Sequence, residues 1–133
     1  MDLMDLKPKS ETVEVLLRHP MTDDALLNDD GSEMSVTVSA SYSKDYRAAM
    51  HEQQDRRLAI MQKKGPNKPY SAADLETDAI DLLAKVTKEW DITYGGSKPK
   101  LTQAKAKEIY SDVFWLRNQI EEALALNVDF TKG

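Results

Sequence analysis

Cysteine is absent from this sequence of 133 residues. Its absence excludes disulfide bonds, thiolate nucleophiles and cysteine-ligated metal ions together. The sequence also has no apolar run near the roughly 18 residues that suggest a membrane-spanning helix. Its first residues, MDLMDLKPKSE, are acidic where a secretory signal would be basic, and they contain no apolar core. We therefore expect a cytoplasmic protein that makes no contact with a membrane.

Histidine is scarce, with two residues in the whole chain. His19 falls at the end of a predicted strand and His51 in a polar helix, and neither has a partner at ligand spacing. The acidic stretch NDDGSE at 28–33 resembles part of a calcium loop. With its glycine in the sixth position, however, the first and twelfth positions are Leu26 and Thr37, which are not carboxylates. We expect no enzyme activity, no cofactor and no metal ion.

Positive charge is in the minority, because 18 Lys and Arg stand against 23 Asp and Glu, a net charge of −5. Nucleic-acid binding would need a concentrated basic face to overcome repulsion from phosphates. Two lysine-containing stretches could form such a face if they meet at one end of the molecule: Lys63, Lys64, Lys68, Lys98, Lys100, Lys105 and Lys107. No aromatic residues are interleaved with them, so we favour a solvated surface. A small adaptor or nucleic-acid-binding virion component is the alternative reading.

The length and composition predict one domain over residues 1–133, of class α+β and mainly α. An N-terminal β-hairpin is followed by three helices in this prediction. Residues 1–10 are polar and predict a flexible arm. Residues 11–42 predict the β-hairpin, and residues 43–130 the helical part.

The hairpin prediction depends on two β-branched stretches, 12–18 and 34–40. The second alternates apolar residues with hydroxyl side chains, which is typical of a strand with one buried face. Asp30-Gly31 between the strands is typical of a tight turn. Because a hairpin alone is not stable, we expect it to lie on the helices.

Serine and threonine residues mark the helix starts, because their side-chain oxygens can accept from free amides in the first turn. The predicted helices begin at Ser43, Ser71 and Thr102 and run to about residues 64, 90 and 126. The first has a polar middle, HEQQDRR, so we expect only its two ends to be packed. The second has an apolar stripe and is expected to be a core helix: Leu75, Ala79, Leu82, Leu83, Val86 and Trp90.

The last predicted helix has more apolar residues than one face can hold. At about 100° per residue, one arc contains Ala106, Ile109, Val113, Leu116, Ile120, Ala123 and Leu124. Tyr110 and Phe114 fall outside the arc on one side, and Trp115 and Leu126 on the other. We treat these four, with Phe130, Tyr46 and Met50, as candidates for partner binding or self-association. The alternative is that Tyr110, Phe114 and Trp115 pack under the hairpin or the loop 91–101.

Several stretches resemble the tail assembly chaperones of long-tailed, non-contractile bacteriophages. The strand ETVEVLLRHP is followed by a second strand and by SKDYR at 43–47. Later come WDI at 90–92, the glycine pair at 95–96, AKAKEIY at 104–110, VFWL at 113–116 and NVDF at 127–130. The similarity covers most of residues 11–130 and depends on order and pattern, with no single diagnostic motif.

This resemblance implies a non-enzymatic protein of virion assembly. Such chaperones bind the tape measure protein, keep it soluble and promote assembly of the tail tube around it. The family commonly makes a second, longer product by a programmed frameshift, which implies contact with the tail tube protein. It also implies self-association, action in the host cytoplasm during assembly and absence from the mature virion.

Overall fold

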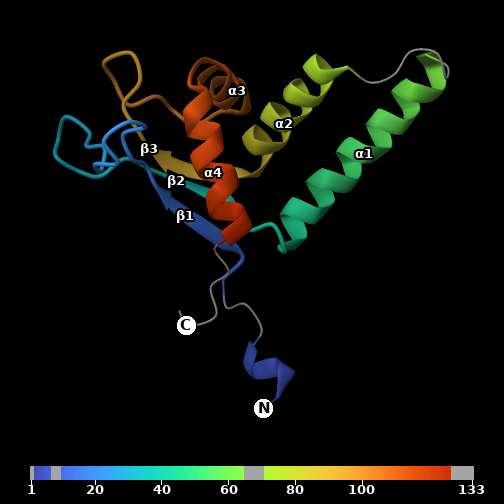
Figure 1. The fold of residues 1–133 in the computed structure, drawn as a ribbon, viewed down its shortest axis with the longest axis horizontal. Coiled ribbons are helices and arrows are strands. Elements are labelled where there is room, and N and C mark those ends of the chain that lie inside the picture. Colours follow the sequence, from blue (N-terminus) through green and yellow to red (C-terminus); the bar gives the residue numbers. More distant parts are fainter. Residues whose placement is uncertain (1, 7–9, 65–70, 127–133) are drawn as a thin grey trace.

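The computed structural model describes residues 2–6, 10–64 and 71–126, and the side chains of Leu6, Lys64 and Leu126 fall outside that description. Figure 1 shows a small sheet with helices gathered on one face and a long helix at the outside. The elements are η1 (Leu3–Leu6), β1 (Thr12–Leu16), β2 (Ser35–Ser39), α1 (Lys44–Lys64), α2 (Ala72–Val86), β3 (Thr87–Asp91), α3 (Gln103–Asp112) and α4 (Phe114–Leu126). The α+β class and the N-terminal hairpin are confirmed.

The sheet is antiparallel, with strand order β1-β2-β3. Its inner face carries the valines of β1 and β2, all of them buried, as the alternation in the sequence predicts. The opposite face carries polar side chains such as Glu14, Thr37 and Glu89, which lie side by side in the strand register. The helices therefore cover one face, and the core lies between that face and α2, α3 and α4.

All three predicted helix starts are confirmed as caps. Ser43 Oγ accepts from the amide of Tyr46 at 3.1 Å, and Thr102 Oγ1 accepts from the amide of Lys105 at 3.0 Å. Ser71 forms a reciprocal capping box with the residue three positions on. The predicted turn at Asp30-Gly31 is also present. Gly31 has a φ of 88°, which residues with a side chain rarely adopt.

The second helix is shorter than predicted. It ends at Val86, and Trp90 belongs to a third strand rather than to the helix stripe. This third strand pairs with the second edge of β2, which would otherwise be open. The spacing of apolar residues in the sequence does not show that β2 has such an unpaired edge. The strand is irregular, since Val38 pairs with Thr87 while Thr37 pairs with Glu89. The extra residue lets Thr87 and Trp90 both face the helices.

The last helix is broken where the prediction had it continuous. Val113 has φ −115° and ψ 78°, outside the helical region, and separates α3 from α4. The predicted arc nevertheless holds for five residues, which are buried: Ala106, Ile109, Leu116, Ile120 and Leu124. The break changes direction, so α3 packs mainly on α2 while α4 lies over β1.

Tyr110 was expected outside the core, and this expectation is wrong. Its side chain is 0% exposed, because α3 presses it between α2 and the start of β3. The hydroxyl of Thr87 donates to the carbonyl of Leu83 at 2.6 Å, so Tyr110 Oη donates to Thr87 Oγ1 at 2.7 Å. Burial raises the pKa of Tyr110 to about 12.

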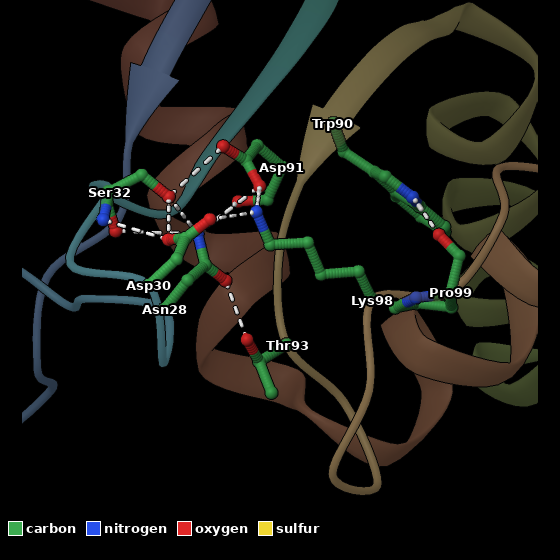
Figure 2. A network of polar contacts seen from close by, with 8 residues as sticks. All are labelled: Asn28, Asp30, Ser32, Trp90, Asp91, Thr93, Lys98 and Pro99. Atoms are coloured by element: carbon green, nitrogen blue, oxygen red, sulfur yellow. Dashed lines mark hydrogen bonds and ion pairs between the residues drawn. The ribbon is translucent and has the colours of Figure 1, made fainter.

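A polar network fastens the hairpin loop to the end of β3, as Figure 2 shows. Asn28, which is buried, donates to both the carbonyl and a carboxylate oxygen of Asp91, and it accepts from Thr93 Oγ1 at 2.6 Å. Lys98 Nζ lies 2.8 Å from Asp30 and 2.9 Å from Asp91. One lysine thus offsets part of the negative charge here, and its ammonium group lowers the pKa of Asp30 below its usual range.

The buried hydroxyl pair gives a test of this packing. Replacing Tyr110 by phenylalanine leaves the ring in place and removes the hydroxyl that bonds Thr87. We expect a loss of about 1 kcal/mol in the free energy of unfolding. Urea denaturation of Tyr110→Phe measures it, with Tyr42→Phe as the comparison, since Tyr42 is half-buried and its hydroxyl donates to the carbonyl of Ser10. An unchanged midpoint for Tyr110→Phe would contradict the buried bond.

Candidate partner-binding groove

An apolar groove lies between α2 and α4. Figure 1 shows that both helices lie on the same face of the sheet. Its volume is about 320 Å³. Most of its lining comes from small and aliphatic side chains, with Tyr46 contributed by the start of α1. The lining residues are Ser41, Tyr46, Ala79, Leu82, Leu83, Glu121, Leu124 and Ala125.

The groove follows from where each helix is fixed. No residue separates α2 from β3, so α2 is tied to one edge of the sheet, while α4 packs on β1 at the other edge. Ala79 and Ala125 face the space between the helices, and their methyl groups are too short to fill it. Leu82 stays partly exposed there, whereas Leu83 and Leu124 are buried beneath.

Charged and polar groups form the rim of the groove. Arg117 of α4 lies 3.4 Å from Glu76 of α2, one helical turn from the groove residues Glu121 and Ala79. Burial, helped by the Glu121 carboxylate, raises the pKa of Tyr46. Its phenol can donate a hydrogen bond to a polar group at the rim. The groove can thus take an apolar side chain along its length and a polar group at its rim.

The predicted candidates are divided among several places. Tyr46 lines the groove, and Trp115 is half-buried against the core near the hairpin loop. Phe114 is 63% exposed at the start of α4, and Met50 is 40% exposed on α1. Tyr110 is inside the core and is removed from the candidates. The side chain of Leu126 and the whole of Phe130 lie outside the described residues.

The accessible side of α2 was missed by the sequence reasoning. Its stripe was expected to be core throughout, yet Leu75 is 49% exposed and Ala79 and Leu82 are partly exposed. The available signal was the length of the stripe, which continues over four helical turns. The neighbouring helix α1 has a polar middle and cannot cover so long an apolar stripe. An apolar stripe facing a polar neighbour indicates surface that the monomer does not cover.

The polar middle of α1 makes the contact with α2. Gln53 Nε2 donates to the backbone carbonyl of Asp78 at 2.6 Å, and Arg57 donates two hydrogen bonds to the Asp78 carboxylate at 3.0 and 3.2 Å. Asp78 is 7% exposed. The prediction that only the ends of α1 pack is therefore wrong. The outer turns of α1 leave Leu58 and Met61 exposed instead.

Removing Arg57 tests this polar attachment. Arg57→Ala leaves a buried carboxylate without its guanidinium, which costs several kcal/mol in a dry site. Because the Arg57 side chain is 32% exposed, solvent screens the pair and we expect a loss of about 2 kcal/mol. Arg56→Ala, one position along on the exposed side, is the matched control and should change stability little. Equal losses in thermal unfolding would contradict the attachment.

Within the described residues, three of the seven lysines in the two predicted stretches form ion pairs with carboxylates. Beside Lys98, Lys105 pairs with Glu108 at 3.2 Å and Lys107 with Asp81 at 3.3 Å. Lys63 and Lys100 are exposed. The side chain of Lys64 and the whole of Lys68 lie outside the described residues. Ion pairing of this kind lowers the positive potential that the nucleic-acid alternative requires.

Residues 2–6, 10–64 and 71–126 contain neither a candidate membrane span nor a candidate metal site. Among these residues, no helix has the length and apolar character needed to cross a membrane. Within the same part of the chain, no three His, Asp or Glu side chains gather as metal ligands would.

Comparison with known proteins yields no relative. No family model matches the chain, and neither the curated proteins nor the solved structures contain a significant match.

Proposed function

We propose that this chain is a tail assembly chaperone of a long-tailed bacteriophage, which binds apolar helical segments of the tape measure protein. The observation that carries the proposal is the unfilled groove between α2 and α4. The tape measure protein is proposed as the partner because the chain resembles tail assembly chaperones in its strand order, glycine loop and C-terminal aromatic stretch. In this role the chain is not an enzyme and needs no cofactor.

The groove has the features of a surface that receives a helix. Its two walls are helices, its floor contains Leu83 and Leu124, and small residues line the opening. A client helix recognised this way places apolar side chains at one turn's spacing into the groove. The partly exposed Leu82 and Tyr46 then gain contacts on binding, and one such anchor contributes about 2 kcal/mol or more.

Assembly on a long client also calls for contact between copies. Phe114, Met50 and the exposed leucine of α1 lie outside the groove and supply apolar surface for it. The net charge of −5 opposes indiscriminate association of the copies. The role places the chain in the host cytoplasm during assembly and outside the mature virion. Contact with the tail tube protein belongs to a frameshifted longer product.

The groove is tested by filling it. Ala125→Arg places a long charged side chain at the groove, in the last turn of α4, where a cation is favourable. We expect recovery of a coexpressed tape measure protein from the same genome to fall about tenfold or more, with unfolding unchanged. Co-purification on the tagged chain measures recovery.

The control is Ser111→Arg, at an exposed position in the last turn of α3 and away from the groove. It should leave recovery near the wild-type level. Recovery that is the same for both variants removes the groove from the proposal. A tape measure protein that stays insoluble beside the wild-type chain counts against the function itself.

Self-association has a separate test. Phe114→Ser removes an aromatic ring that is 63% exposed, so stability should stay within about 0.5 kcal/mol of wild type. Sedimentation at rising concentration should show weaker association for this variant. Leu27→Ser, at a 56% exposed leucine of the hairpin loop, is the control. Undiminished association of Phe114→Ser would exclude Phe114 from the contact between copies.

A further inference from the structure

The outer edge of β1 has a row of backbone groups directed away from the sheet. Leu17 donates to the carbonyl of Met34 at 3.0 Å, and Ala40 donates to that of Glu11 at 2.8 Å. Bonded pairs alternate along an antiparallel ladder, so odd-numbered residues of this strand bond β2. The N–H and C=O groups of the even-numbered residues therefore point to the open edge.

Both ends of that edge are already occupied by side chains. Ser10 Oγ accepts from the amide of Thr12 at 3.3 Å and donates to its carbonyl at 3.0 Å. At the other end, Gln119 of α4 acts as a partner strand would. Its amide group accepts from the N–H of Arg18 at 3.0 Å and donates to the Arg18 carbonyl at 2.7 Å.

Glu14 and Leu16 lie between these caps, and within the described residues their edge-facing backbone groups have no hydrogen-bond partner. A groove of about 420 Å³ runs along this stretch, between β1, α4 and the start of the hairpin loop. Its lining includes Glu14, Leu16, Arg18, Asp23, Glu122 and Ala123. Four free backbone groups in a groove match the requirements for adding a strand.

We infer that this edge binds a short, extended, basic segment of another protein by β-augmentation. The charge of the groove selects the occupant, because Glu14, Asp23 and Glu122 outnumber its one arginine. Within the described residues, neither Glu14 nor Glu122 forms an ion pair. A second copy of this chain would instead bring its own Glu14 and Glu122 to the same edge. The like charges of the two copies would repel each other.

The register also specifies the segment's side chains. Residues opposite Glu14 and Leu16 lie on the outer face of the sheet, so a lysine or arginine is favoured beside Glu14 and an apolar residue beside Leu16. The residue between them points inward, toward Ala123 of α4. This surface is separate from the groove between α2 and α4, and the inference does not depend on the proposed function.

The probe is a short capped peptide with a lysine placed to lie beside Glu14, a valine placed to lie beside Leu16, and a second valine between them. Hydrogen exchange followed by NMR reports the backbone directly. We expect the peptide to slow exchange of the Glu14 and Leu16 amides, which are unbonded in the free chain. An analogue with N-methyl groups along its bonding edge should bind about tenfold or more weakly, since it loses about two hydrogen bonds.

Two variants address the protein side. Glu14→Lys reverses the charge beside the edge and should weaken binding about tenfold. Leu16→Pro removes an edge amide while sparing the bonds to β2, and it should abolish binding. If Leu16→Pro does not fold, Glu14→Lys and the N-methyl analogue still decide the question.

Three results would overturn the inference. One is equal binding of the N-methylated peptide, and another is peptide binding without protection of Glu14 and Leu16. The third is protection of these amides by protein concentration alone, because a second copy would then occupy the edge.

Discussion

The direct passage from α2 into β3 determines how the rest of the molecule is arranged. With no residue between Val86 and Thr87, the axis of the helix is fixed to the edge of the sheet. Thr87 secures the junction, since its hydroxyl donates to Leu83 and accepts from Tyr110 of α3. The third strand, the position of α3 and the separation between α2 and α4 all follow from this attachment. The groove is a consequence of that separation.

The features predicted correctly from the sequence are those that local chemistry decides. The hairpin strands were visible because Val36 and Val38 alternate with hydroxyl side chains, and the caps because Ser71 and Thr102 precede apolar periodic stretches. Both signals involve residues a few positions apart, so they survive in any tertiary context.

The incorrect expectations all involve contacts between distant parts of the chain. Trp90 continues the apolar spacing of α2, and only the open edge of β2 makes it part of a strand. Tyr110 lies outside the arc of a continuous helix, but the break at Val113 turns α3 toward the junction. The groove was missed for the same reason. The surplus apolar surface was sought on the last helix, whereas Leu75 of α2 is exposed and Ala79 and Leu82 are partly exposed.

The two proposed surfaces differ in chemistry. The groove between α2 and α4 is apolar and bounded by helices, so it suits a helical segment. The edge of β1 offers backbone groups beside acidic side chains, so it suits an extended basic one. They lie on opposite sides of α4, which contributes Leu124 and Ala125 to one and Gln119 and Ala123 to the other. One helix thus lies between the two proposed binding surfaces.

The central claim is that the separation of α2 from α4 creates a binding surface. Amide hydrogen exchange of the chain, alone and in complex with a tape measure segment, tests it most directly. The account predicts that added protection is concentrated at residues 79–83 of α2 and 121–125 of α4. Protection confined to the exposed outer turns of α1, with those two stretches unchanged, would contradict it.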